Sequence, residues 1–393
     1  MRALCWNGIN DLRVETVNDP QIVNPHDVIL KVGLSTTCGS DLHFIDGYIP
    51  GMREGDVIGH EFMGEIVEVG PEVKNFSVGQ RVVVPSFIGC GQCHYCSSDQ
   101  WSLCDNSHPK PELSEPLLGY PTAGIYGYTH AFGGYAGSHA EYIRVPYADS
   151  DCFLVPDGVS DVQALFLSDA APTGFMGADF CDIKPGDTVA VWGCGGVGLM
   201  AQQSAFLLGA ERVIAIDRLP ERLEMARTHV GSETLDRTSI DGGPEAVTDA
   251  LRELTGGRGP DACIDAVGME AGGDGIQQAY DKAKQLLHLE TDRAQALRES
   301  IHAVRKGGTL SVLGVYGLTD KFPMGLIMNK GLTLRSAQQH GQAYLPRLLE
   351  HAERGELDTS FLATHEFPLE DAVKGYDMFK HKTDGCVRAV FRP

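Results

Sequence analysis

The sequence predicts an α/β protein of two domains, a mostly β first domain and a second domain built on a doubly wound parallel sheet. Its 393 residues exceed what one ordinary hydrophobic core holds. Short β-like runs broken by Gly, Pro, Asn and Asp fill the first part, and from about Gly186 strand-like and helix-like runs alternate. We therefore expect domains at 1–170 and 171–340, followed by a segment, 341–393, that returns to the first domain.

The individual elements follow from apolar runs bounded by turn residues and from apolar residues at helical spacing. In the first domain we expect strands at 28–32, 64–69 and 81–85, and in the final segment a strand at 386–391. In the second domain we expect strands at 188–192, 212–217, 261–266 and 309–315, and helices at 197–208, 220–230 and 245–254.

Residues 270–307 are expected to form a helical insertion between two strands of the second domain. Apolar residues recur at helical spacing over 285–289 and 294–304, and Thr291 and Asp292 mark a break. The insertion is longer than a minimal crossover between parallel strands. A surface helical hairpin, a cover over a bound cofactor and a contact between subunits all stay open.

Composition excludes several classes of partner. The formal charge of −21 opposes binding to nucleic acid or to an anionic membrane. No apolar run is long enough to span a bilayer, and the first residues show no charged-then-apolar leader. Eleven cysteines in such a chain indicate reduced thiols, so we expect a cytoplasmic protein without disulfides.

Four cysteines form a ladder of the pattern C-x2-C-x2-C-x7-C within a loop at about 88–106. They are Cys90, Cys93, Cys96 and Cys104. Four thiolates at short spacing match tetrahedral zinc, whose Zn–S distance is about 2.3 Å. Because four protein ligands leave no position for water or substrate, this predicted zinc is structural. Six further cysteines are expected to be buried small hydrophobic residues.

A glycine-rich turn predicts a dinucleotide site. The pattern G-x-G-x-x-G follows the strand expected at 188–192 and opens the next helix. Asp217 closes the second strand nineteen residues after Gly198, where a carboxylate can bind ribose hydroxyls and favours NAD over NADP. Arg218 would soften that preference, although a surface role is the simpler one. The predicted cofactor contacts here are Gly193, Gly195, Gly196, Val197, Gly198 and Asp217.

A second metal site is expected in the first domain. Cys38 and His60 come from separate loops and are half of an open zinc site, which keeps a position for water or substrate. Zinc there would polarise an alcohol or carbonyl oxygen. The third ligand has to come from elsewhere, and Asp169 is the best candidate because it precedes the dinucleotide domain. The alternative is that Asp169 caps the following helix.

These residues together resemble one enzyme family. Cys38 with Ser40 and His43, the Gly59-His60-Glu61 triplet, the cysteine ladder and the glycine turn are similar, in order and spacing, to zinc-dependent medium-chain alcohol dehydrogenases. The resemblance covers essentially the whole chain and implies a GroES-like catalytic domain and a Rossmann domain. Stretches 140–149 and 167–174 and the insertion most resemble glutathione-independent formaldehyde dehydrogenases.

The resemblance also implies roles for single residues. It implies a catalytic zinc on Cys38, His60 and Asp169, with Glu61 as a neighbouring or transient ligand, and a proton relay from Ser40 through the cofactor ribose to His43. Most family members carry Cys where this chain has Asp169, and a carboxylate should leave zinc more electrophilic. The implied nicotinamide and ribose contacts are Thr173, Val197, Arg222, Val267, Leu313 and Val315.

The resulting expectation is a homo-oligomeric enzyme with NAD and two zinc ions per chain. It would transfer hydride between NAD and a small alcohol or aldehyde, with formaldehyde or a primary alcohol first. Oxidation of a glutathione or other thiol adduct of formaldehyde, a polyol or amino-alcohol substrate, and a non-catalytic cofactor-binding protein are the alternatives. The stretch 120–135, dense in Gly and Tyr, either lines the substrate pocket or is a packed loop.

Overall fold

The structure is a computed structural model that describes four stretches of the chain, residues 1–240, 245–268, 294–316 and 322–393. These residues form two compact units. The first contains Met1–Pro172 and Gln339–Pro393, and the second contains Thr173–Gln338. The first unit is therefore made from two segments that are far apart in the sequence.

Antiparallel pairing dominates the first unit. Its larger sheet has seven strands in the order β15-β16-β3-β5-β6-β8, with β7 also paired to β3, and a smaller sheet has the order β2-β1-β4. The strands are β1 (Arg2–Trp6), β2 (Leu12–Thr16), β3 (Val28–Thr36), β4 (Asp56–Val57), β5 (Glu61–Val69), β6 (Arg81–Val84), β7 (Tyr142–Val145), β8 (Phe153–Leu154), β15 (His365–Pro368) and β16 (Ala389–Arg392).

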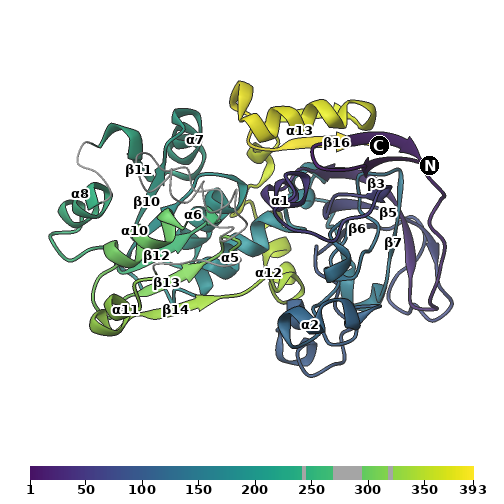
Figure 1. Cartoon of the computed structure of the whole chain (residues 1–393), viewed down its shortest axis with the longest axis horizontal. Coiled ribbons are helices and arrows are strands. Elements are labelled where there is room, and N and C mark those ends of the chain that lie inside the picture. The colour runs from purple at the N-terminus through teal and green to yellow at the C-terminus, as the bar shows by residue number, and fades with distance from the viewer. Residues whose placement is uncertain (241–244, 269–293, 317–321) are drawn as a thin grey trace. The chain divides into compact units, whose positions relative to one another are not determined.

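Strand β3 is the centre of this sheet. Most of its nine residues are buried, as expected for a strand covered on both faces. Its first half pairs with β7, and its last two residues pair with β16 near the C-terminus. Figure 1 shows β16 beside β3. The first unit's α-helices are α1 (Gly39–Ile45), α2 (Glu115–Leu118), α3 (Ala148–Asp151), α4 (Asp161–Phe166), α12 (Gly341–Glu353) and α13 (Ala372–His381).

The second unit contains one six-stranded parallel sheet of the order β11-β10-β9-β12-β13-β14. The first strand, β9, lies in the middle of the sheet. Strands β10 and β11 are added on one side of it and β12, β13 and β14 on the other, which is the doubly wound arrangement. The predicted fold class is confirmed. The strands are β9 (Thr188–Trp192), β10 (Arg212–Asp217), β11 (Glu233–Asp236), β12 (Ala262–Asp265), β13 (Thr309–Val312) and β14 (Thr333–Ser336).

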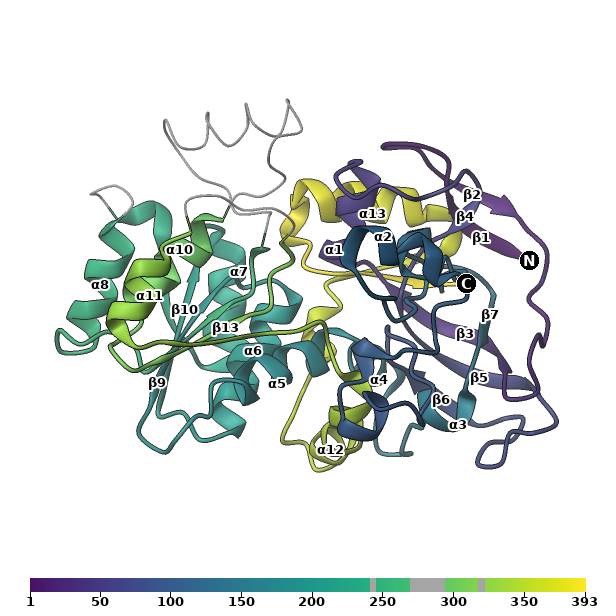
Figure 2. The ribbon, with the colours of Figure 1, turned by 60° about the horizontal axis from the view of Figure 1, so that its bottom comes forward.

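Helices cover both faces of this sheet, as Figure 2 shows. Alternate residues of β9 enter two different cores: Val189 and Val191 pack with α5 and α6, whereas Ala190 and Trp192 pack with α8 and α10. The helices are α5 (Ala170–Asp179), α6 (Gly196–Leu207), α7 (Pro220–Met225), α8 (Ala246–Leu254), α10 (Gln295–Ala303) and α11 (Met324–Lys330).

The expected insertion at 270–307 divides into two parts. Residues 270–293 lie outside the described residues, so the helix expected at 285–289 stays a prediction. Helix α10 matches the run expected at 294–304, and its Leu297 and Ile301 are buried in the core beside β12 and β13. This second part is therefore a packed helix, and the alternatives for the insertion as a whole stay open.

Candidate active site and metal centres

Strand register brings Cys38 beside His60 and Glu61. Thr36 at the end of β3 pairs with Glu61 at the start of β5, and two residues after Thr36 the chain reaches Cys38. One ligand atom from each of Cys38, His60 and Glu61 lies within 4.8 Å of the others, and all three side chains are buried. We call this group the Cys38 centre.

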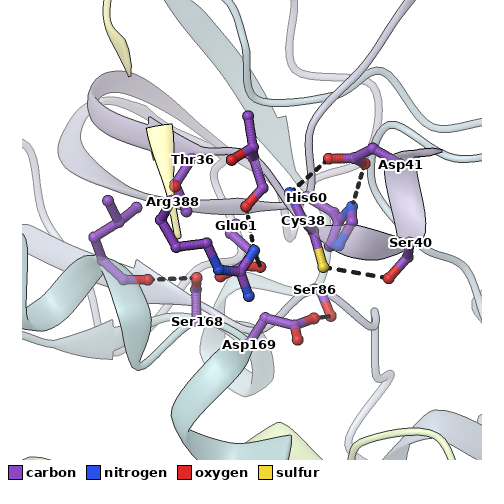
Figure 3. A network of polar contacts seen from close by, with 12 residues as sticks. Thr36, Cys38, Ser40, Asp41, His60, Glu61, Ser86, Ser168, Asp169 and Arg388 are labelled. Atoms are coloured by element: carbon purple, nitrogen blue, oxygen red, sulfur yellow. Dashed lines mark hydrogen bonds and ion pairs between the residues drawn. The ribbon is translucent and has the colours of Figure 1, made fainter. Parts of the chain in front are cut away.

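Asp41 supports two members of the Cys38 centre. It occupies the third position of α1, where its Oδ2 accepts a hydrogen bond from the backbone N–H of Cys38 at 2.9 Å. Its Oδ1 lies 3.1 Å from Nδ1 of His60 (Figure 3). A carboxylate at Nδ1 favours the tautomer that leaves Nε2 free to act as a ligand. Asp41 was given no role from the sequence, although its spacing from Cys38 is a helix-capping pattern.

Arg388 neutralises Glu61, the third member of the Cys38 centre. Its Nη1 lies 2.8 Å from Oε1 of Glu61, and both side chains are buried. Arg388 directly precedes β16, and the pairing of β16 with the end of β3 carries it to this site. The guanidinium also donates to the backbone carbonyl of Thr37. No sequence pattern pointed to Arg388, because the contact depends on pairing between opposite ends of the chain.

The charges at the Cys38 centre favour a bound cation. Burial raises the pKa of the Cys38 thiol, and the carboxylate of Glu61 raises it further. Burial also raises the pKa of Glu61, which Arg388 lowers and Asp169 raises again. One guanidinium thus faces a thiol and two carboxyl groups. A divalent cation would stabilise the ionised form of each acid, so this donor set fits zinc.

Asp169 lies near the Cys38 centre but does not join its ligand group. Its Oδ2 accepts hydrogen bonds from Oγ of Ser86 at 2.6 Å and from Nε2 of Gln339 at 3.1 Å. Figure 3 shows the bond to Ser86. Within the described part of the chain, the carboxylate that lies within 4.8 Å of the other two ligand atoms is that of Glu61. The expected role of Asp169 as third ligand stays a prediction. Ser86 and Gln339 had no signal in the sequence.

Ser40 and His43 lie three residues apart on α1. The hydroxyl of Ser40 is 3.2 Å from Sγ of Cys38, which places it at the edge of the Cys38 centre. His43 is buried one helical turn further along. The helix therefore holds both candidate relay residues on one side.

The four cysteines of the ladder form a second candidate metal centre, which we call the four-cysteine centre. One Sγ from each of the four lies within 4.8 Å of the others, and all are free thiols. Backbone N–H groups of the same loop donate to the sulfurs: Cys90 to Cys104 at 3.3 Å, Cys93 to Cys90 at 3.4 Å and Cys96 to Cys93 at 3.5 Å. Such hydrogen bonds stabilise thiolates, so this donor set also fits zinc.

A buried carboxyl group anchors the entry to the four-cysteine centre. Asp151 accepts from the backbone N–H of Gly89 at 3.0 Å and from Nε2 of Gln342 at 2.9 Å. Gly89 directly precedes Cys90 and has no room for a side chain, because an added Cβ would lie 2.5 Å from the ring of Trp101.

The glycine-rich turn follows β9 at the point where the strand order reverses. Gly193 has φ +94°, a conformation that favours glycine, and an added Cβ at Gly198 would lie 2.0 Å from the carbonyl oxygen of Gly193. Gly195 is the N-cap of the twelve-residue α6. This arrangement leaves the first N–H groups of α6 available for a phosphate.

Asp217 holds the glycine-rich turn directly. Its Oδ2 accepts from the backbone N–H of Cys194 at 2.7 Å, and its Oδ1 accepts from the N–H groups of Arg218 and Leu219. Arg222 reaches the same turn, since an added Cβ at Gly195 would lie 3.5 Å from its Nη1. The structure thus brings Asp217 and Arg222 to the same glycine-rich turn, and their contacts with a dinucleotide stay predictions.

Three of the expected nicotinamide-side residues meet near the carboxyl ends of β12 and β13. An added Cβ at Gly193 would lie 3.0 Å from Val267, and one at Gly268 would lie 2.7 Å from the backbone of Val315. The N–H of Leu313 bonds the carbonyl of Asp265 at 2.9 Å. Thr173 lies in α5 and is half-buried. Their contacts with a nicotinamide ring remain predictions.

Within 120–135, Tyr126 and Tyr128 are buried in packed clusters, which favours the packed-loop interpretation for these two side chains. The six cysteines outside both centres are buried. Among the described helices, none is long and apolar enough to cross a membrane.

Two family models match separate parts of the chain. Residues 24–157 match the model of the alcohol dehydrogenase GroES-like domain, and residues 196–285 match that of the zinc-binding dehydrogenases. The zinc-type alcohol dehydrogenase-like protein AdhB of Bacillus subtilis is 39% identical over the full length of both chains.

Two further relatives extend this likeness. The glutathione-independent formaldehyde dehydrogenase of Bacillus subtilis is 32% identical, over 96% of this chain and 94% of that protein. The solved structure of alcohol dehydrogenase TADH from Thermus sp. ATN1 matches with a TM-score of 0.83 and 32% identity, over 100% of this chain and 99% of that one.

Proposed function

Because this chain belongs to the zinc-type alcohol dehydrogenase family, we propose that it transfers hydride between NAD and a small alcohol or aldehyde. The observation that carries the proposal is the Cys38 centre, a buried group of thiol, imidazole and carboxylate. Its acidic groups outnumber the single guanidinium of Arg388. A purely structural core would gain little from such a group, because unpaired buried charge is costly.

In this proposal Cys38 and His60 hold a zinc ion, together with a carboxylate from Glu61 or Asp169. When bound, zinc supplies a Lewis acid for the oxygen of an alcohol or carbonyl. Asp41 keeps the His60 ring oriented, and Arg388 balances the charge of Glu61. Either carboxylate could serve as the third donor, because Arg388 holds Glu61 and Ser86 with Gln339 holds Asp169.

The proton released from the substrate leaves through α1. The hydroxyl of Ser40 stands beside Cys38, so it can accept this proton and donate its own onward. His43 would be the final acceptor in the proposed relay, and the ribose of a bound NAD would link it to Ser40. Ser40 thus moves a proton, and the zinc ligands do not have to change protonation.

NAD is the proposed cofactor. The N-terminus of α6 would bind the pyrophosphate, and the carboxylate of Asp217 would bind ribose hydroxyls. A 2′-phosphate would meet this carboxylate unfavourably. Arg218 and Arg222 oppose that preference, so the ratio of the dissociation constants for NAD and NADP tests the assignment directly.

A small uncharged substrate such as formaldehyde or a primary alcohol is proposed first. The 32% identity to the glutathione-independent formaldehyde dehydrogenase of Bacillus subtilis supports it. An anionic glutathione adduct is the second candidate and needs cations for recognition. Arg53, Lys110 and Arg144 are the basic residues of the substrate-side loops, and Arg144 already pairs with the buried Asp27 at 2.9 Å. This pairing favours the small substrate.

The test is NADH formation by the purified protein over a panel of aldehydes and alcohols, with and without glutathione, alongside zinc analysis. We expect two zinc ions per chain and turnover of formaldehyde or a primary alcohol without glutathione. One tightly held zinc and no turnover would overturn the proposal. Turnover only with glutathione would establish the second candidate.

Separate Asp169→Ala and Glu61→Ala variants identify the third ligand. The true ligand is the one whose loss removes zinc from the Cys38 centre while the four-cysteine centre keeps its metal. If Asp169→Ala retains full zinc content and turnover, the role of Asp169 as a ligand is wrong.

A further inference from the structure

A line of buried polar side chains runs from Asp41 away from the Cys38 centre. Oη of Tyr376 donates to Oδ2 of Asp41 at 2.7 Å. Nε2 of His139 lies 2.8 Å from Oη of Tyr376, and Nδ1 of His139 lies 2.8 Å from Oγ of Ser35. All four side chains are at most 3% exposed. The line therefore connects Asp41, which contacts the candidate ligand His60, to three residues that have no part in the proposed chemistry.

The hydrogen bonds in this line run in a single direction. The one hydrogen of Tyr376 goes to Asp41, so Tyr376 has to accept from Nε2–H of His139. A neutral imidazole with its proton on Nε2 accepts at Nδ1, and the hydroxyl of Ser35 supplies that hydrogen. Every donor is thus oriented toward Asp41. Burial lowers the pKa of His139 to about 4, in keeping with a neutral ring.

His139 also contacts the backbone beside His60. Gly59 directly precedes His60 and has φ +98°, and an added Cβ there would lie 2.6 Å from Nδ1 of His139. The backbone N–H of His139 bonds the carbonyl of Ile58 at 3.0 Å. The position of His139 can therefore influence His60 in two ways. It packs against the backbone at Gly59, and it is hydrogen-bonded through Tyr376 to Asp41, which contacts His60.

The line joins elements that are distant in sequence. Ser35 lies on β3, Asp41 on α1 and Tyr376 on α13, while His139 precedes β7. Burying these polar groups has a desolvation cost that apolar side chains of similar size would avoid. A role in orienting Asp41 explains why these polar groups are buried. The line of hydrogen bonds ends on Asp41, whose carboxylate contacts both Cys38 and His60.

We propose that His139 and Tyr376 are positioning residues for a metal ion at the Cys38 centre. They hold Asp41 in the orientation that fixes the ring and the tautomer of His60. The inference rests on the proposed function, since it requires that the Cys38 centre binds metal.

The first test is Tyr376→Phe, which removes one oxygen from the line. The full-length chain is freed of metal and titrated with Co²⁺ and Zn²⁺ against a chelator of known affinity. Loss of a partner of this kind lowers metal affinity by about 10- to 100-fold, and we expect this loss at the Cys38 centre alone. The absorption bands of bound Co²⁺ should also shift, which a purely structural role would not cause.

Tyr126→Phe is the matched control. Tyr126 is fully buried in the same unit, and within the described residues its hydroxyl has no hydrogen-bond partner. The variant removes the same atom from a similar environment, so it should leave both metal affinities and the Co²⁺ spectrum unchanged. The four-cysteine centre is an internal standard in every titration.

Two variants of His139 test the direction of the line. His139→Gln keeps a donor near Nε2 and should retain most of the affinity, whereas His139→Phe has no donor and should lose as much as Tyr376→Phe. The double variant His139→Phe/Tyr376→Phe should lose little more than either single one, because both interrupt the same line.

The outcomes separate this inference from the proposed function. If wild type binds metal at the Cys38 centre and both Tyr376→Phe and His139→Phe match its affinity and spectrum, the inference is wrong and the proposed function stands. If wild type binds no metal at the Cys38 centre, the proposed function fails as well. Folding of each variant is checked by circular dichroism and by the metal content of the four-cysteine centre.

Discussion

The two candidate metal centres of the first unit are assembled in opposite ways. The four-cysteine centre takes all its ligands from fifteen consecutive residues, and backbone N–H groups of that loop donate to its sulfurs. The Cys38 centre takes ligands from two strand ends, and side chains as distant as Tyr376 and Arg388 support it. A local centre depends on turns, whereas a distributed centre depends on strand register.

This difference follows the demands of the two kinds of site. A closed tetrahedral site needs four correctly spaced thiolates, and here backbone N–H groups of the same loop donate to them. An open site has to hold its ligands while leaving a position for substrate, so its orientation comes from surrounding residues. Disturbing the first should therefore change stability, and disturbing the second should change chemistry.

Cys38→Ala should have the largest effect of these variants, and it tests whether the Cys38 centre serves chemistry and not stability. Removal of a ligand from the Cys38 centre should lower kcat by about 10³-fold, since a bound metal contributes several kcal/mol to the transition state. Zinc analysis should show that one metal of two is lost, and the melting temperature should fall only slightly. Cys5→Ala removes an equally buried thiol and should leave turnover intact.

Cys96→Ser should have the reverse effect. Loss of the metal at the four-cysteine centre should lower the free energy of unfolding by about 4 kcal/mol, measured by chemical denaturation. We also expect faster proteolysis within 88–106. Molecules that stay folded should retain kcat. A large fall in kcat with unchanged stability would contradict the division between the two centres.

Gly59→Ala acts on the residues that position His60 in the Cys38 centre. The added Cβ meets the His139 ring in a left-handed backbone conformation, so we expect a loss of about 3 kcal/mol in stability. Weaker metal binding at the Cys38 centre should accompany it. Gly55→Ala is the control: φ there is +88° with nothing within 4 Å, and only the backbone cost of about 1 kcal/mol should appear.

Asp151→Ala tests whether the local centre has any distant support. Removing the buried acceptor of Gly89 and Gln342 should cost about 2 kcal/mol, seen as a lower denaturation midpoint, and should weaken metal binding at the four-cysteine centre. Asp149, a neighbouring carboxylate that accepts from two backbone N–H groups at the surface, is the comparison. Asp149→Ala should change the free energy of unfolding by about 0.5 kcal/mol or less. An equal loss in both variants would contradict a specific role of Asp151 in supporting the four-cysteine centre.

Much of the fold could be predicted because its signals are short. The strand at 188–192 is observed as β9 and the strand at 212–217 as β10, since continuous apolar runs between turns are typical of buried parallel strands. Strand β14 was not predicted. All four of its residues are exposed, so no apolar run marks it, and it forms through pairing with β13.

The four-cysteine loop and the glycine-rich turn could be recognised from the order of residues alone, because their geometry is set within a few bonds by ligand spacing and by backbone conformations that favour glycine. The surroundings of Cys38 could not be recognised in full from the order of residues. The resemblance implied Glu61 as a neighbouring or transient ligand. It did not imply that Arg388 lies beside Glu61 or that Asp169 bonds Ser86 and Gln339. The position of Arg388 beside Glu61 arises when β3, β5 and β16 pair, and strand pairing over some 350 residues is a property of the folded chain. The bonds of Asp169 arise where residues 86, 169 and 339, from three segments of the first unit, come together.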